Sequence, residues 1–348
     1  MIKSSHRVLF LIVFVVCSGR WASAAPVLRP EPDLASLERG LERLRLRWNV
    51  PGMAAGVALS NRIVWTKGFG YAELATKQAV TPDTVFHLAS LTKPFAAVVL
   101  LQLVERRQLD LDEPVSAFGI DLKANGVVRV RHLLTHTSEG QPGESYRYSG
   151  ARFAKLDKVI EGKTQKSFAH EMAERILDPL GLTNTSPNPY AASACAAAGR
   201  DPAAFLQRTA RGYAFDGKTP VEYPKHFVTA AGLVSTVCDV LRFSIALDED
   251  KLLQPETKAM AFTPAKTSNG KTLPYGLGWF VQEGRTKIVW HYGWDRANST
   301  LIIKVPDRNV SFVLLGNSEA LSRKFDLGGD ANVRRSPFAK EFLKSVGL

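Results

Sequence analysis

The hydrophobic pattern of the chain changes from helical to strand-like, back to helical, and to strand-like again before the end. Leucines recur at helical spacing across residues 34–48, which predicts an amphipathic helix. The runs MAAGVAL (53–59) and IVWTKGFG (63–70) follow, on either side of a short polar turn. Apolar runs of this length around a turn predict a β-hairpin close to the start of the chain.

The middle of the chain has helical periodicity and the last third has strands. The segment from Ser90 to Arg106 is helical in pattern and carries few charges. Four further segments predict helices: RHLLTH, ARFAKLDKVIE, SFAHEMAERIL and DVLRFSIAL. Near the end, LGWFVQ with TKIVWH and STLIIKV with VSFVLLG predict two more hairpins, and residues 337–346 predict a closing helix.

Strands at both ends and helices between them indicate an α/β protein of the α+β type. We expect one antiparallel sheet, built from both chain ends and flanked by helices, with an inserted, mostly helical domain. The sheet domain is predicted to comprise residues 25–89 and 240–348, and the helical domain residues 90–239. We expect the active site to lie between the two.

The first 24 residues have the pattern of a cleavable signal peptide. Two basic residues precede an apolar run of ten, VLFLIVFVVC, and Ala22-Ser23-Ala24 supplies the small residues of a cleavage site. The alternative is an uncleaved anchor, but ten residues are fewer than the roughly 20 of a membrane-spanning helix. The pattern predicts cleavage after Ala24, a secreted or periplasmic protein, and no membrane span after cleavage.

The composition is that of a soluble globular protein with an excess of basic residues. The 348 residues carry a net charge of +12, which falls to +9 when Lys3, Arg7 and Arg20 leave with the signal peptide. No basic run is interleaved with aromatic residues, so the sequence gives no indication of nucleic-acid binding. The excess charge is either ordinary surface charge or an attraction to an anionic cell-wall polymer.

Cysteines and histidines give no indication of a metal site, and we expect neither a metal nor another cofactor. After cleavage two cysteines remain, Cys195 and Cys238, which either pair in an oxidising compartment or stay as buried thiols. His132 and His136 are four residues apart, but Leu133 stands where the metalloprotease motif HExxH has its glutamate. This spacing favours structural histidines.

The stretch FHLASLTKPF contains a serine and a lysine placed for nucleophilic chemistry. Ser90 opens an apolar helix and Lys93 follows three residues later, so both lie on one helical face. Burial lowers the pKa of a lysine and makes it a base, which a serine hydroxyl needs in order to act as a nucleophile. The helix N-terminus also favours the negative charge of an oxyanion.

Two later motifs complete a resemblance to a known family. YRYSG contains Tyr148 ahead of a helix, and WHYGW contains His291 at the end of a strand. In this order the motifs resemble those of the serine β-lactamase and penicillin-recognising superfamily. The closest likeness is to class C-like enzymes and their esterase and D-stereospecific peptidase relatives. Segments such as RHLLTHTSEG and LPYGLGWFVQ extend the resemblance from about Pro51 to Ser318.

The resemblance implies roles for individual residues. Ser90 would be the acylated nucleophile and Lys93 its proton partner, with Tyr148 as second member of the base pair, either phenolate-like or sharing a proton with Lys93. Which of the two is the acylation base is left open. The backbone N–H groups of Ser90 and Trp294 would form the oxyanion hole. The implied substrate-binding residues are Gly150, His291, Tyr292, Gly293 and Trp294, with His291 on an edge strand.

Two departures from the family pattern bear on the substrate. Gly150 stands where the family has an asparagine, whose side-chain amide would bind the substrate. Ser149 or Asn298 is the alternative source of this contact. Tyr292 stands where the family commonly has a small hydroxyl residue. We therefore expect an exported serine hydrolase that acts on small ester or peptide-like molecules and prefers esters. The alternatives are a D-Ala-D-Ala carboxypeptidase, a class C-like β-lactamase, or an inactive protein that binds cell wall or a partner.

Overall fold

The computed structural model describes residues 31–348, so the predicted signal peptide lies outside the described residues. Seven strands form an antiparallel sheet in the order β3-β2-β1-β10-β9-β8-β7. In chain order they are β1 (Gly52–Leu59), β2 (Arg62–Glu73), β3 (Gln78–Ala79), β7 (Phe280–Gln282), β8 (Ile288–Asp295), β9 (Asn298–Val305) and β10 (Val310–Gly316).

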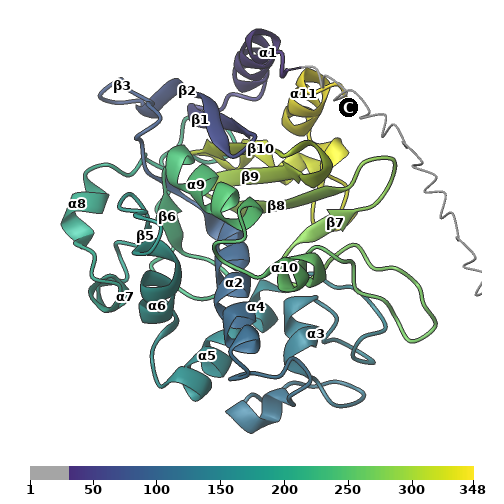
Figure 1. Ribbon diagram of the computed structural model, residues 1–348. Coiled ribbons are helices and arrows are strands. Elements are labelled where there is room, and N and C mark those ends of the chain that lie inside the picture. The colour runs from purple at the N-terminus through teal and green to yellow at the C-terminus, as the bar shows by residue number, and fades with distance from the viewer. Residues whose placement is uncertain (1–30) are drawn as a thin grey trace, which may run out of the picture. The chain divides into compact units, whose positions relative to one another are not determined.

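The two ends of the chain meet in the middle of this sheet. β1 pairs with β10 along its length, with Val57 opposite Phe312, and Figure 1 shows the early and late strands side by side. The turn between β1 and β2 places Ser60 and Asn61 at positive φ, as a tight two-residue hairpin turn requires. The prediction of one antiparallel sheet built from both ends is confirmed.

Helices cover both faces of the sheet, and nearly all positions of the central strands β1, β8, β9 and β10 are buried on both sides. α1 (Leu34–Arg47) and α11 (Pro337–Ser345) cover one face, where Phe342 stacks on Phe312 with ring centroids 4.7 Å apart. α2 (Thr92–Glu105) and α9 (Val237–Asp248) lie on the other side, and Phe95 stacks there on Phe243 at 3.8 Å. Each of these contacts joins elements far apart in sequence.

A buried lysine fixes α9 against the sheet. Lys304 of β9 is fully buried, and its Nζ lies 2.6 Å from Ser244 Oγ and 2.8 Å from Asp248 Oδ2, both on α9. A buried charge needs such partners, because removal from water costs several kcal/mol per ion. Lys304 is therefore a structural lysine.

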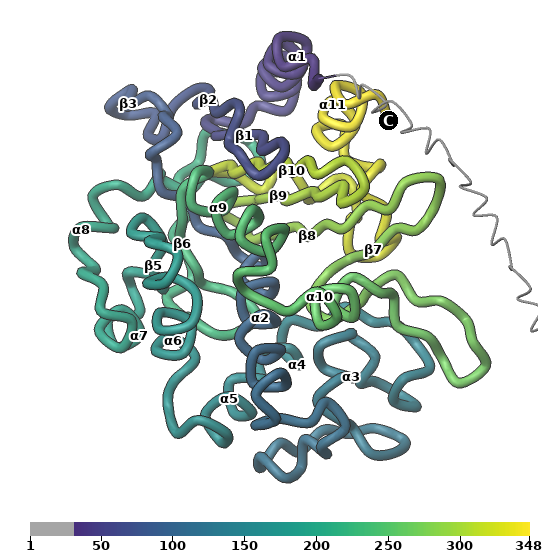
Figure 2. The backbone as a smooth tube through the Cα atoms, in the orientation of Figure 1, coloured from purple at the N-terminus to yellow at the C-terminus, as the bar shows by residue number. Residues whose placement is uncertain are grey.

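The middle of the chain is mostly helical, as expected, and Figure 2 shows it leaving the sheet after β3 and returning at β7. A small second sheet, in the order β4-β6-β5, lies within it. Its strands are β4 (Phe86–His87), β5 (Ser186–Pro187) and β6 (Leu233–Ser235). The remaining helices are α3 (Val130–Leu134), α4 (Gly150–Phe153), α5 (Leu156–Thr164), α6 (Phe168–Met172), α7 (Ala192–Ala197), α8 (Pro202–Leu206) and α10 (Pro255–Ala261). The domain boundaries stay a prediction.

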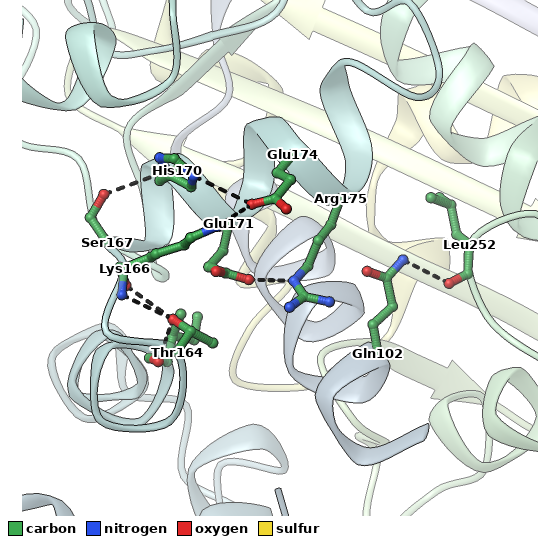
Figure 3. Close-up of polar contacts among 10 residues, drawn as sticks. Gln102, Thr164, Lys166, Ser167, His170, Glu171, Glu174, Arg175 and Leu252 are labelled. Atoms are coloured by element: carbon green, nitrogen blue, oxygen red, sulfur yellow. Dashed lines mark hydrogen bonds and ion pairs between the residues drawn. The ribbon is translucent and has the colours of Figure 1, made fainter. Parts of the chain in front are cut away.

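Two predicted helices are interrupted. ARFAKLDKVIE forms α4 and α5, because Lys155 and Asp157 bond three residues back and tighten the junction into 3₁₀ turns. SFAHEMAERIL forms α6 and then a π-helical turn, Ala173–Leu177. Figure 3 shows the Arg175 guanidinium bonded to the Glu171 carboxylate at this transition, where both side chains are buried. None of the described helices is long and apolar enough to span a membrane.

The two cysteines of the described chain are not paired. Cys195 is buried in α7 and Cys238 is partly buried in α9. The Cys195 sulfur lies 3.4 Å from the Pro187 carbonyl oxygen and 3.7 Å from Ser186 Oγ. Of the two alternatives left open by the sequence, the structure has free thiols.

Candidate active site

Ser90 and Lys93 lie together at the start of α2, as their spacing predicts. Ser90 sits in a 3₁₀ turn, Ala89–Leu91, that runs directly into the helix, and its side chain is partly exposed. Lys93 is 0% exposed, and its Nζ lies 2.8 Å from Ser90 Oγ and 2.9 Å from the Ala230 carbonyl oxygen. A carbonyl only accepts, so one N–H of Lys93 points at Ala230. A neutral amine then has its lone pair free for the Ser90 hydroxyl.

The backbone before Ser90 is strained. Ala89 has φ of +48°, a left-handed conformation that costs a non-glycine residue about 1–2 kcal/mol. Thr92 Oγ1 donates to the Ala89 carbonyl at 2.7 Å, and Leu88 N–H donates to Leu233 of the small sheet at 2.8 Å. These bonds hold the turn that carries the chain from β4 into the 3₁₀ turn with Ser90.

Burial lowers the pKa of Lys93 to about 7. Desolvation destabilises the ammonium ion relative to the neutral amine, and no carboxylate among the described residues counteracts it. Near neutral pH a large fraction of Lys93 is therefore uncharged. An uncharged amine 2.8 Å from a hydroxyl is positioned to accept its proton.

Tyr148 lies beside this pair with a protonated phenol. Lys93 Nζ lies 4.9 Å from the centroid of the Tyr148 ring. Burial raises the pKa of Tyr148 well above its usual value, although the nearby Ser90 hydroxyl opposes the rise. The phenol oxygen is buried and has no hydrogen-bond partner of normal geometry among the described residues. These surroundings favour the neutral phenol over the phenolate-like alternative.

Gly293 lets β8 approach the turn that carries Ser90. A Cβ at Gly293 would lie 2.0 Å from the Leu88 carbonyl oxygen and 2.4 Å from Thr300 Oγ1, so only glycine fits. β8 is not an edge strand throughout, because β7 pairs with its first residues, as far as Trp290. Beyond that point the described sheet has no further strand on this side, and the backbone of β8 faces the Ser90 turn.

His291 is directed inward. Its ring is fully buried, with Nδ1 2.7 Å from the Tyr292 carbonyl oxygen and Nε2 2.8 Å from Tyr275 Oη. The carbonyl requires Nδ1 to carry the hydrogen, so Nε2 accepts from the Tyr275 hydroxyl. Burial lowers the pKa of His291 well below its usual value, which keeps the ring neutral. Both ring nitrogens are thus occupied within the protein.

The other predicted substrate-binding residues differ in exposure. Tyr292 is nearly buried, and burial raises its pKa to about 12. Trp294 is 48% exposed, and its Nε1 donates to Glu319 Oε2 at 3.1 Å. Gly150 is the first residue of α4, and a Cβ added there would have nothing within 4 Å. The structure therefore leaves Trp294 as the exposed aromatic side chain of this set.

The two residues considered as substitutes for the missing amide have other contacts. Ser149 Oγ accepts from Arg152 N–H and so caps α4. Asn298 Nδ2 donates to the His87 carbonyl at 2.8 Å, while its Oδ1 is buried without a hydrogen-bond partner among the described residues. Each of these two side chains thus already makes one hydrogen bond within the protein.

Comparison with known proteins identifies the family. The family model described as Beta-lactamase matches residues 39–333, most of the chain. The chain belongs to the beta-lactamase family. The predictions of this family and of its β-lactamase/transpeptidase-like fold are thereby confirmed, and the expectation of an enzyme of the serine hydrolase class agrees with them.

The relatives that are similar in sequence to this beta-lactamase family member include a penicillin-binding protein and a D-aminopeptidase. Penicillin-binding protein 4* of Bacillus subtilis is 27% identical over 307 residues, covering 74% of this chain and 66% of that protein. A D-aminopeptidase of Brucella ovis is 25% identical over 329 residues, covering 83% of this chain and 61% of that protein. The chain thus spans somewhat less than two thirds of the length of these relatives.

Solved structures share the fold of this beta-lactamase family member. The octameric penicillin-binding protein homologue from Pyrococcus abyssi superimposes with a TM-score of 0.73 at 24% identity, covering 89% of this chain and 79% of that one. D-amino acid amidase from Ochrobactrum anthropi gives a TM-score of 0.71 at 21% identity, covering 89% of this chain and 98% of that one.

Two groups at the site of this beta-lactamase family member were not found from the sequence. The Ala230 carbonyl contacts Lys93 from 137 residues away, and His136 lies against Tyr148 with ring centroids 4.3 Å apart. No pattern in the sequence indicates a backbone carbonyl at a site. His136 was singled out for its spacing from His132, which favoured a structural histidine pair and gave no indication of a contact with Tyr148.

Proposed function

We propose that this protein is a serine hydrolase that forms an acyl-enzyme on Ser90. The observation that carries the proposal is the position of Lys93. Its Nζ lies 2.8 Å from Ser90 Oγ, fully buried, with a pKa lowered to about 7. A serine hydroxyl is a weak nucleophile until a nearby base accepts its proton. Lys93 meets the requirement for this base in distance, orientation and charge.

In the acylation step, Ser90 Oγ attacks the carbonyl carbon of the substrate while Lys93 Nζ takes the hydroxyl proton. The carbonyl oxygen becomes an oxyanion, which the backbone N–H groups of Ser90 and Trp294 would stabilise. When the tetrahedral intermediate collapses, the leaving group departs with the proton held at Lys93. Water then repeats the sequence on the acyl-enzyme and releases the acid.

We infer that Tyr148 works as a neutral phenol next to Lys93. Its raised pKa opposes a phenolate, and Lys93 Nζ lies 4.9 Å from the centroid of its ring. A phenol can donate its proton to a leaving group and recover one from the lysine ammonium. Lys93 is then the acylation base and Tyr148 the proton relay.

Gly150 supports a preference for esters over β-lactams and peptides. It offers no side-chain amide to a substrate, and the neighbouring Ser149 hydroxyl caps α4 instead. A missing hydrogen bond in a desolvated site costs about 1–3 kcal/mol. An ester without a flanking amide does not incur this cost, and an alkoxide or phenolate leaves with less help from an acid than an amine does.

A second candidate substrate class is amides and peptides of D-amino acids. The relatives and structural neighbours include proteins named D-aminopeptidase and D-amino acid amidase. An amide leaving group needs protonation, for which the neutral Tyr148 phenol is suited. Among the earlier alternatives, D-Ala-D-Ala carboxypeptidase activity belongs to this second class, and β-lactamase activity shares with it the cleavage of an amide bond.

We further propose that the protein acts outside the cytoplasm. The support is the sequence of residues 1–24, with its basic start, apolar run and small-residue cleavage site. The net charge of +9 after cleavage would favour contact with an anionic cell-wall polymer. N-terminal sequencing of exported material should return a start near Ala25, and a start at Met1 would support the uncleaved anchor.

The decisive experiment is to label the purified protein with a fluorophosphonate and locate the adduct by mass spectrometry. We expect an adduct on Ser90 in the unmodified protein and none in Ser90→Ala. Turnover of p-nitrophenyl esters, D-amino-acid amides and a chromogenic cephalosporin then ranks the substrate classes. A protein that folds and forms no adduct at Ser90 would be the inactive binding protein instead.

A further inference from the structure

His136 holds the backbone on both sides of Tyr148. Its carbonyl oxygen accepts from Arg147 N–H at 2.8 Å, and its Nδ1 accepts from Ser149 N–H at 3.1 Å. The residue between these two donors is Tyr148. One histidine thus fixes the peptide groups before and after the proposed proton relay, as neighbouring strands do in a sheet.

The hydrogen bonds also determine the state of the His136 ring. Because Nδ1 accepts a backbone N–H, the ring hydrogen of the neutral form is on Nε2. That nitrogen is buried, has no hydrogen-bond partner among the described residues, and belongs to a side chain that is only 2% exposed. His136 also has φ of +54°. A strained residue with an unused donor is costly to bury, which calls for an explanation beyond packing.

The ring itself supports the ring of Tyr148. The two centroids are 4.3 Å apart with the planes tilted by 36°, and the Tyr275 ring lies 4.8 Å from His136 on another side. The Tyr148 hydroxyl has no hydrogen-bond partner of normal geometry among the described residues. Tyr148 is therefore also held through its two backbone neighbours, each of which donates an N–H to His136.

We propose that His136 is the positioning residue for Tyr148, holding the phenol next to Ser90 and Lys93 through the Ser149 N–H···Nδ1 bond. The proposal rests on the proposed acyl-enzyme function. His136 touches no reacting atom in this scheme. Its loss should slow the formation of the acyl-enzyme, because a displaced Tyr148 also changes the surroundings of the base Lys93, whose Nζ lies 4.9 Å from the centroid of the Tyr148 ring. The pocket that binds the substrate should stay formed.

Two substitutions separate the hydrogen bond from the ring. His136→Phe keeps an aromatic ring and removes the acceptor for Ser149 N–H. His136→Asn removes the ring, places a carbonyl oxygen near the position of Nδ1, and tolerates positive φ. We expect the rate of fluorophosphonate labelling at Ser90 to fall roughly 10- to 100-fold in His136→Phe, the effect of one lost buried hydrogen bond. Labelling in His136→Asn should recover to within about fivefold of the unmodified protein.

The chain offers a matched control in the same region. His132 Nδ1 accepts from Arg129 N–H at 3.1 Å, a bond of the same kind that caps α3. His132→Phe should lower the melting temperature as His136→Phe does and leave the labelling rate unchanged. For ester turnover, His136→Phe should lower kcat and change KM less than threefold, because Tyr148 acts on the reaction rather than on binding.

The outcomes separate this proposal from the function on which it rests. No labelling of Ser90 in the unmodified protein refutes the proposed function before any variant is compared. Normal labelling in folded His136→Phe, or a loss matched by His132→Phe, refutes the positioning role. So does a His136→Asn variant that is folded and as slow as His136→Phe. If His136→Phe does not fold, His136→Gly replaces it, since glycine accepts the positive φ and also lacks the acceptor.

Discussion

Asp157 accepts a hydrogen bond from Thr229 N–H at 2.7 Å, one residue before the carbonyl that contacts Lys93. Thr229 Oγ1 also donates to the Phe153 carbonyl at 3.1 Å. The Ala230 carbonyl that follows lies 2.9 Å from Lys93 Nζ. Asp157 is therefore connected to Lys93 through the turn formed by Thr229 and Ala230.

This relationship predicts different effects for two substitutions of Asp157. Asp157→Ala removes the acceptor for Thr229 N–H and should lower both the stability, by about 1–3 kcal/mol, and the labelling rate of Ser90. Asp157→Asn keeps an oxygen near the same position and should retain most of the stability and most of the labelling rate. Urea unfolding and fluorophosphonate labelling measure the two effects. Equal labelling rates in folded Asp157→Ala and the unmodified protein would contradict the prediction.

The rate should depend on pH through Lys93. Because the neutral amine is the proposed base and its pKa is lowered to about 7, kcat/KM for a neutral ester should rise with pH and level off above about 7 to 8. Lys93→Ala should lower kcat by roughly 10²–10⁴. Lys93→Arg should be as slow, since a guanidinium stays protonated. A rate independent of pH between 5 and 9, or near-normal turnover in Lys93→Arg, would argue against Lys93 as the base.

The helices and strands that could be predicted from the sequence are those whose pattern of apolar and polar residues lies within one continuous segment. Apolar runs on either side of polar turns predicted β1, β2, β9 and β10, and apolar residues at helical spacing predicted α1 and α11. Ser90 and Lys93 were found because three residues along one helix already fix their proximity. The small sheet was missed because its strands have two or three residues, too few to show an alternation.

The remaining parts of the site depend on contacts between distant segments. The direction of His291 follows from Tyr275, which lies 16 residues earlier and meets it only in the folded chain. His136, Asp157 and Ala230 belong to different elements and converge on Lys93 and Tyr148. A single sequence carries the identities of these residues but not their distances, so neither the neutral state of Tyr148 nor the inward position of His291 could be predicted.

Gly150→Asn should narrow the preference for esters. The space around a Cβ at this position is open, and Gly150 has no positive φ that a side chain would strain. The fold should therefore tolerate the substitution. We expect the ratio of kcat/KM for p-nitrophenyl butyrate to that for a chromogenic cephalosporin to fall by roughly 5- to 150-fold, the effect of regaining one hydrogen bond.

Gly150→Ala is the control for this substitution, because it adds a Cβ without an amide and should leave the ratio unchanged. A cephalosporin turned over as fast as the ester by the unmodified protein would contradict the preference itself. An unchanged ratio in Gly150→Asn would mean that the glycine is not its cause.

Stability should decrease as the pH falls below about 6.5, because buried histidines cannot take up a proton in the folded state. Burial lowers the pKa of His87 to about 3, and lowers the pKa of His136 and of His291 well below the usual value. The unfolded chain protonates these rings near pH 6.5, so between this value and the folded pKa it binds more protons than the native state. Their contribution is fully present above about 6.5 and is lost on acidification.

Asp157 acts in the opposite direction within the same range. Burial raises its pKa from 3.8 to about 6, so between these values the folded state binds the extra proton. The buried histidines outnumber this one carboxyl group, so unfolding near pH 5 takes up protons and stability should fall as the pH is lowered there. Urea unfolding at pH 7, 6 and 5 measures how stability changes with pH.

His87→Phe tests the contribution of one histidine. It keeps a ring stacked on Tyr223, where the centroids are now 4.2 Å apart, and should reduce the number of protons taken up on unfolding by about one. A stability that is constant or rises from pH 6.5 to 5 would show that these histidines are protonated in the native protein.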